Sequence, residues 1–297
     1  MRRIFLPVAF VVLASILLTG CSSSGASKNE SGTEKVSVVA SFYPLAFIAE
    51  QVGGSSISVV NLTKSGVEPH DLELAPSQVA SLSATDLLFY IKGFNPAMDK
   101  AVSQSTIKNV IDVSSLEELP SPEAQIAGND PHIWQDPVKY GEMASRFEKV
   151  LVRIDPARSQ KYASNLAKFK KSLMKLDTEF RTGLAACERS EIITSHSAFG
   201  YLAKRYHLVQ VGILGLSPDA EPSPKRLNEI AKQVKRDKIT TIFFESILSP
   251  KVAKTLASDL KIKAEVLDPI EGVGENQTYF SVMESNLVAL RKALNCN

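Results

Sequence analysis

Short apolar runs alternate with longer amphipathic stretches along most of this chain. In the first half, predicted strands are VSVVASF (36–42), ISVVNL (57–62), LLFYI (87–91) and NVIDV (109–113). Between them, YPLAFIAEQVGG (43–54) and PSQVASLSATD (76–86) predict helices, and the pair Gly53-Gly54 is typical of a helix end. Strands that alternate with helices favour a parallel sheet, so we expect an α/β layer fold.

The pattern changes to purely helical spacing in the middle of the chain. Asp136-Pro137 and Asp155-Pro156 are each typical of a helix start, with Asp as the cap and Pro in the first turn. After the second start, one apolar stripe has spacings of three and four: Tyr162, Leu166, Phe169, Leu173, Leu176, Phe180 and Leu184. A helix over 156–184 would be roughly 43 Å long at 1.5 Å per residue. We expect it to connect and brace two lobes.

Alternation resumes in the last third of the chain. Predicted strands are EIIT (191–194), LVQVGIL (208–214), TTIFF (240–244) and AEVL (264–267), each followed by a predicted helix. We therefore predict two α/β lobes with parallel sheets, at residues 36–136 and 186–297, joined by linking helices at 137–185.

The first residues have the pattern of an export signal. Arg2 and Arg3 precede an apolar run that ends at Leu18, and LTGC (18–21) resembles the lipobox of bacterial lipoproteins. We expect a signal peptide at 1–20, a lipid on Cys21 and a Ser/Gly-rich tether through residue 35. The protein would then be extracytoplasmic, anchored to the cell membrane on its periplasmic or cell-surface side. The alternative is a simple secretory signal with a chance cysteine.

Bulk composition is that of an ordinary globular protein, with 44% hydrophobic residues, 22% charged residues and a net charge of +2. Nothing in it indicates binding of nucleic acid. Lipidation of Cys21 would leave Cys187 and Cys296 as the remaining cysteines. Export to an oxidising compartment favours a disulfide between them, although two buried thiols are the alternative.

Three of the four histidines fall in predicted loops, where they could bind a metal. His70 and His196 follow strands, His132 precedes the first linking helix, and Asp268 follows the last strand. Because ligands of open α/β sheets bind at the carboxyl ends of strands, these groups could meet in one cleft between the lobes. Three imidazoles and one carboxylate suit zinc.

Nearby residues have other expected roles. Glu245 could accept a hydrogen bond from a ligand imidazole or could cap a helix. Glu68 is expected on the loop surface rather than on the metal, and Trp134 is expected to pack beside the site. His207 begins a predicted apolar strand, which indicates a structural role.

Several phrases resemble the zinc/manganese solute-binding proteins of bacterial ABC transporters, in that family's order. They are VEPHDLELAPSQVASLSATDLLFY, NDPHIWQDP, SHSAFGYLAKRYHL, GLSPDAEPSPKRLNEIAK and LDPIEG. The resemblance implies two α/β lobes on a rigid helix, with the metal in the cleft. It implies the ligands His70, His132, His196 and Asp268, and a membrane permease as partner. We expect a monomeric carrier and not an enzyme.

The third ligand position separates zinc carriers, which have histidine there, from many manganese carriers, which have glutamate. His196 therefore favours zinc, with manganese as the alternative. Many zinc members of the family carry a long loop rich in histidine and acidic residues before the second ligand. In this chain that region is EELPSPEAQIAG (117–128), which contains no histidine. A zinc hydrolase is a further alternative, but the chain has no H-E-x-x-H pair and a fourth protein ligand would displace the catalytic water. An adhesin role is not tested by any sequence feature.

Overall fold

A computed structural model describes residues 34–114 and 130–297 of the chain. The predicted signal peptide, Cys21 and most of the tether lie outside the described residues, as does the loop 117–128. Within the described ranges, no helix is both long and apolar enough to cross a membrane.

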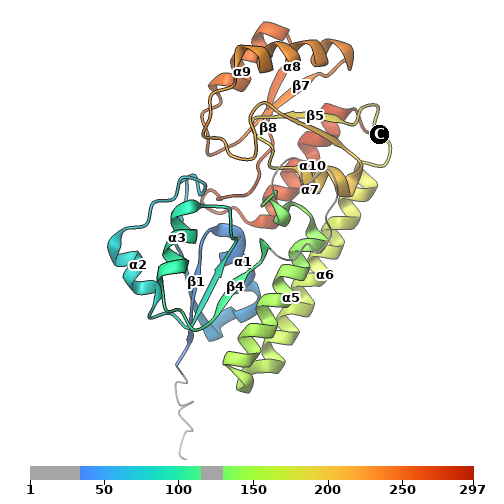
Figure 1. Ribbon diagram of the computed structural model, residues 1–297. Helices are drawn as coiled ribbons and strands as arrows, with labels where there is room; N and C mark the ends of the chain where they lie inside the picture. The colour runs from blue at the N-terminus through green and yellow to red at the C-terminus, as the bar shows by residue number, and fades with distance from the viewer. Residues whose placement is uncertain (1–33, 115–129) are drawn as a thin grey trace, which may run out of the picture. The chain divides into compact units, whose positions relative to one another are not determined.

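Two four-stranded sheets, each wholly parallel, form the centres of two lobes (Figure 1). The first sheet has the order β2-β1-β3-β4, and its strands are β1 (Val36–Ala40), β2 (Ile57–Asn61), β3 (Leu87–Tyr90) and β4 (Val110–Asp112). Every residue of β3 is buried, which is characteristic of a central strand covered on both faces. The predicted fold class is therefore confirmed.

The second sheet repeats the same order, β6-β5-β7-β8. Its strands are β5 (Glu191–Thr194), β6 (Val209–Gly212), β7 (Thr241–Phe244) and β8 (Lys263–Val266). In both sheets the order reverses beside the first strand, and such a switch point leaves a crevice at the carboxyl ends of the strands. In the second sheet the crevice lies between β5 and β7.

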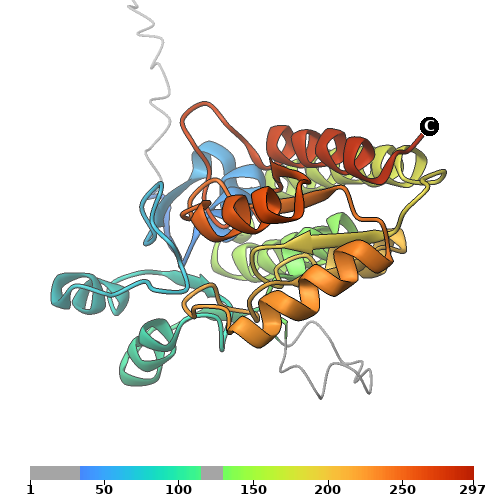
Figure 2. The same ribbon diagram turned by 90° about the horizontal axis from the view of Figure 1, so that it is seen from above.

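Helices cover both faces of each sheet. The first sheet is covered by α1 (Tyr43–Gly53) on one face and by α2 (Pro76–Leu82) and α3 (Pro96–Gln104) on the other. The second is covered by α8 (Pro224–Arg236) and α9 (Lys251–Leu260) on one face and by α7 (Gly200–Tyr206) and α10 (Tyr279–Leu294) on the other (Figure 2). The helix α3 was not predicted, because its nine residues carry only a weak apolar stripe.

Two long antiparallel helices join the lobes. They are α5 (Pro137–Ile154) and α6 (Ser159–Gly183), with the short 3-10 helix η4 (Pro156–Arg158) between them. Asp136 caps α5 by accepting hydrogen bonds from the backbone N–H groups of Val138 and Lys139. In α6 the predicted stripe is buried at Tyr162, Phe169, Leu173, Leu176 and Phe180 and half-buried at Leu166, so its apolar periodicity was correctly interpreted.

One hydrophobic core runs through both lobes and the linking helices. It includes Phe42 of the first lobe, Phe169 of α6 and Tyr279 of α10. The ring of Tyr279 stacks on that of Tyr140 with centroids 4.4 Å apart, and its hydroxyl donates to the backbone oxygen of Trp134. Lys35–Asn297 accordingly forms one compact unit.

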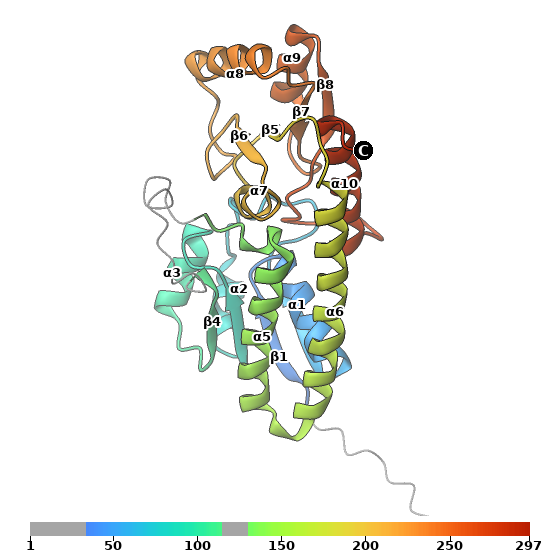
Figure 3. The same cartoon turned by 90° about the vertical axis from the view of Figure 1, so that its right-hand side faces the viewer.

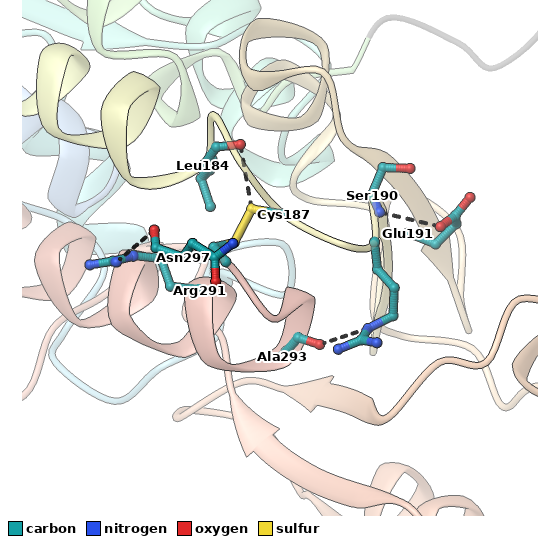
Figure 4. Close-up of a disulfide and its surroundings, with 9 residues drawn as sticks. Leu184, Cys187, Ser190, Glu191, Arg291, Ala293 and Asn297 are labelled. Atoms are coloured by element: carbon teal, nitrogen blue, oxygen red, sulfur yellow. Dashed lines mark hydrogen bonds between the residues drawn. A yellow bond between two sulfur atoms is a disulfide. The ribbon is translucent and has the colours of Figure 1, made fainter.

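A disulfide closes the second lobe. Cys187 precedes β5 and Cys296 follows α10, and their sulfur atoms are bonded at 1.96 Å (Figure 4). The sulfur of Cys187 also lies 3.4 Å from the backbone oxygen of Leu184, near the end of α6. The cysteine pair expected from the sequence is thus joined in the structure.

Candidate metal centre

Three imidazoles and one carboxylate converge between the lobes. His70, His132, His196 and Glu271 each offer one ligand atom, and these four atoms lie within 4.8 Å of one another. The side chains of all four are almost wholly inaccessible to solvent. Such a group of nitrogen and oxygen donors has the composition of a tetrahedral zinc site.

The first ligand candidate, His70, is held by a buried asparagine at the start of α3. The side-chain nitrogen of Asn95 donates to the backbone oxygens of Pro69, His70 and Leu72 at 3.1, 2.7 and 3.1 Å. Its side-chain oxygen caps α3 by accepting from the N–H of Met98. The ring of His70 packs on Phe94 with centroids 4.3 Å apart. Pro69 and Asn95 together therefore fix the loop that presents this imidazole.

Carboxylates behind the other two imidazoles set their orientation. His132 Nδ1 lies 2.7 Å from Asp130 Oδ1, and His196 Nδ1 lies 2.6 Å from Glu245 Oε1. A proton shared at Nδ1 leaves the lone pair of Nε2 for a metal, which is the usual arrangement of a histidine ligand. Glu245 has the position that the sequence interpretation proposed for it, whereas Asp130 was not identified.

Glu271 is the carboxylate in the cluster. Its Oε1 lies 3.4 Å from His70 Nε2, 3.2 Å from His132 Nε2 and 3.4 Å from His196 Nε2. Among the described residues, neither carboxylate oxygen of Glu271 has a hydrogen-bond partner of ordinary geometry. His70 Nε2 also lacks such a partner. Buried polar atoms without partners are rare, and a bound cation would satisfy these.

The sequence prediction named Asp268 as the acidic ligand, but the structure places Glu271 there. The oxygens of Asp268 are occupied, because Oδ1 accepts from the N–H of Ile270 at 2.7 Å and Oδ2 accepts from the hydroxyl of Ser246. Asp268 therefore shapes the turn that leads to Glu271. Both carboxylates lie in the phrase LDPIEG, and of the two only Glu271 belongs to the four-residue cluster.

The turn before Glu271 has an unusual backbone. Ile270 has φ = 62°, a left-handed conformation that is strained for a β-branched residue. Trp134 Nε1 donates to the backbone oxygen of Pro269 at 2.7 Å, and the side-chain nitrogen of Gln135 donates to the same oxygen. Groups from the segment that follows His132 thus hold the turn in place, as is common where a site requires a strained residue.

Charges in the cluster are strongly coupled. Burial lowers the pKa of His196, but the Glu245 and Glu271 carboxylates outweigh it and raise that pKa to about 10. Burial raises the pKa of Glu271, but the imidazoles of His132, His196 and His70 outweigh it and hold that pKa well below its usual value. A metal bound here would replace protons on the imidazoles, so binding would release protons.

Two further residues differ from their expected places. Burial and the neighbouring Glu271 raise the pKa of Glu68 to about 8, so Glu68 is not a plain surface residue, although it is outside the four-residue cluster. His207 does not begin a strand. It is an exposed residue with φ = 59° at the end of α7, and it does not belong to the four-residue cluster.

Comparisons with known proteins agree on one family. A family model described as "Zinc-uptake complex component A periplasmic" matches residues 38–293. The chain is 33% identical over 307 residues to the high-affinity zinc uptake system protein ZnuA of Bacillus subtilis, with 96% of each chain covered. It is 32% identical to the zinc-binding lipoprotein AdcA of Streptococcus pneumoniae. That alignment includes 98% of this chain and 61% of AdcA.

Solved structures with the same fold include two streptococcal proteins. The laminin-binding protein Lmb of Streptococcus agalactiae, described as bifunctional with adhesin and metal-transporting activity, has a TM-score of 0.80 and 32% identity, covering 88% of this chain and 100% of that chain. The Zn(II)-bound ZnuA-like domain of S. pneumoniae AdcA has a TM-score of 0.76 and 33% identity, with the same coverage.

Proposed function

We propose that this chain, which belongs to the family described as component A of zinc-uptake complexes, captures one zinc ion outside the cytoplasm and delivers it to an ABC permease. The single observation that carries the proposal is the buried group of three Nε2 atoms around one carboxylate oxygen. The ion is the cargo, held by His70, His132, His196 and Glu271. Similarity to zinc-binding proteins over nearly the whole chain supports the same conclusion.

Zinc is favoured over manganese by the donor set. Three imidazole nitrogens and one carboxylate suit zinc, whereas manganese prefers more oxygen ligands. The carboxylates of Asp130 and Glu245 behind two of the imidazoles increase the basicity of those ligands. They also compensate the charge of a divalent ion that would otherwise be buried next to a single carboxylate.

A carrier fits the geometry better than a hydrolase does. Four side-chain ligands fill a tetrahedral shell, and no ligand position remains for an activated water. The donors also come from both lobes, since His70 follows β2, while His196 and Glu271 follow β5 and β8. Binding would therefore join the two lobes through the ion. We further propose that a lipid on Cys21 holds the protein at the membrane and that the protein is a monomer.

The proposal is tested by titrating metal-free protein with zinc and manganese in competition with a chelator at one pH. We expect one zinc per chain and a higher affinity for zinc than for manganese. His196→Glu replaces a nitrogen donor by oxygen, so the ratio of the two dissociation constants should move toward manganese. Absence of stoichiometric zinc binding, or hydrolysis of model esters or peptides by the zinc-loaded protein, would contradict a carrier function.

A further inference from the structure

Charge is unevenly distributed over this protein. The segment 137–183, which comprises α5, η4 and α6, carries eleven Lys or Arg residues and five Asp or Glu residues, a net charge of +6. The whole chain carries +2, so all other residues together carry −4. None of the four residues of the metal cluster lies in this helical pair, so metal binding does not account for the positive charge of the pair.

Much of this charge lies on one outward face of α6. Lys168, Lys171 and Lys175 follow one another at spacings of three and four, so they share a helix face, and all three are exposed. In the described part of the chain, Lys168 and Lys171 form no ion pair, and Lys175 pairs with Glu179 at 3.1 Å. Figure 3 shows α5 and α6 side by side in the foreground.

The second helix also carries exposed basic residues. Lys149 and Arg153 are exposed near the end of α5. Two acidic residues of α5 and its end already have basic partners, since Glu142 lies 3.3 Å from Lys139 and Asp155 pairs with Arg158. The basic face is defined here by Lys168, Lys171 and Lys175 of α6.

We propose that the basic face binds the surface of a bilayer that contains anionic phospholipids. Clustered lysine and arginine side chains are attracted to such a surface without inserting into it. The negative charge of the remaining chain would turn the rest of the molecule away from the lipid. The contact would thus orient the metal-binding cleft relative to the membrane in which the permease lies.

A bilayer is chosen over another polyanion because of where the chain enters the first sheet. The first residue of β1, Val36, pairs with Ile57, and Lys161 Nζ at the start of α6 donates to Ser55 Oγ at 3.1 Å. The chain therefore enters the fold beside the first turn of α6. Only thirteen residues separate Cys21 from Lys35, so the proposed lipid would be close in sequence to this point. This choice of a bilayer rests on the proposed lipid anchor, whereas the charge argument does not.

The test uses protein without a lipid. Because Lys35–Asn297 is a compact unit with its own core, protein starting at residue 22 can be mixed with vesicles and sedimented. We expect binding to vesicles of phosphatidylglycerol and phosphatidylcholine and little binding to vesicles of pure phosphatidylcholine. Binding should be lost at about 1 M salt, where the Debye length falls to about 3 Å. Each lysine contributes roughly fivefold to partitioning, so K168Q/K171Q/K175Q should weaken binding about a hundredfold.

A matched variant removes the same charge elsewhere. Lys225, Lys232 and Lys235 are exposed on α8, and K225Q/K232Q/K235Q should bind vesicles nearly as well as the unaltered protein. Equal losses in the two variants, or no binding to anionic vesicles, would overturn the proposal. Binding to soluble poly(glycerol phosphate) but not to vesicles would overturn it in favour of a soluble polyanion. Zinc titration of each variant separates these outcomes from failure of the carrier function.

Discussion

Individual side chains in this protein act in pairs, with a carboxylate behind an imidazole. Asp130 and Glu245 each bind the Nδ1 atom of a histidine whose Nε2 faces Glu271. His70 differs, because no carboxylate of the described residues bonds to its Nδ1 and its loop is held through the backbone by Asn95. The three histidines and Glu271 would therefore contact the ion, whereas Asp130, Glu245 and Asn95 orient the histidines.

The identity of the acidic ligand can be tested by comparing two amide substitutions. Glu271→Gln removes the charge at the centre of the three imidazoles and should weaken zinc binding by at least tenfold. Asp268→Asn keeps a side-chain oxygen that can accept from the N–H of Ile270, so its effect should be smaller. Competition titration measures both. A larger loss for Asp268→Asn than for Glu271→Gln would restore Asp268 as the ligand.

The contribution of His70 can be tested against the one histidine outside the cluster. His70→Ala should weaken zinc binding by an order of magnitude or more, about 1.4 kcal/mol, because one nitrogen donor is lost. His207→Asn is the control, since asparagine tolerates the left-handed backbone at that position and the residue is exposed. Calorimetry that gave the same affinity for both variants would exclude His70 from the site.

At the scale of elements, a cluster of ion pairs joins three helices. Asp177 of α6 accepts from Arg205 Nε of α7 at 2.6 Å and from the hydroxyl of Tyr206 at 3.1 Å. Arg205 Nε also lies 3.3 Å from Asp136, which caps α5. Burial raises the pKa of Asp177, but Arg205 and Tyr206 outweigh it, so the pKa is lower than usual. The charged form of Asp177 is thus stabilised in the folded protein.

We expect Asp177→Asn to lower the free energy of unfolding by about 1.5–3 kcal/mol at pH 7, the usual range for hydrogen bonds to charged groups. Because the folded pKa is depressed, this stabilisation is complete above the unfolded value of about 3.8 and is lost as the pH falls through the folded value. Denaturant unfolding at pH 7 and near pH 3 measures the difference.

Glu179→Gln removes the same charge from the same helix and serves as the control. Its partner Lys175 is largely exposed, so less than about 1 kcal/mol should be lost. An effect of Asp177→Asn no larger than that of Glu179→Gln would show that the cluster does not hold the helices together.

At the scale of the whole molecule, the disulfide joins the two ends of the second lobe. Cys187 and Cys296 are separated by 109 residues and enclose all of the second sheet. For a loop of this length, the loss of chain entropy in the unfolded state is estimated to stabilise the folded protein by about 4–5 kcal/mol. Measured stabilisation by disulfides commonly falls below such estimates. The bond should therefore contribute to stability without touching the metal cluster.

We expect Cys187→Ser/Cys296→Ser to lower the free energy of unfolding by about 2–5 kcal/mol and to leave zinc stoichiometry unchanged. A reductant should destabilise the unaltered protein by a similar amount and have no effect on the double variant. Thiol titration of denatured, unreduced protein should detect no free thiol at these two positions. Two free thiols, or an unchanged unfolding midpoint, would contradict the bond.

Much of the fold could be predicted because its signals are local. The strands appear as short apolar runs and α6 as apolar spacings of three and four. Proline after aspartate indicates the start of α5 and of η4, which leads into α6. Where the local signal is weak, prediction was less successful. The stretch Pro96–Gln104 has few apolar residues, and the helix there depends on the capping by Asn95 and on burial of Met98.

The sequence by itself determined two α/β lobes, the linking helices and three histidines at the ends or starts of elements. Tertiary structure alone decided that Glu271 rather than Asp268 faces those histidines. These residues are three positions apart in one turn, and the turn's direction depends on Ile270 at positive φ and on donors from Trp134 and Gln135. Those donors lie more than 130 residues away in the chain, so no local pattern records them. Periodicity is a property of neighbours in sequence, whereas the direction of a side chain in a turn is set by distant contacts.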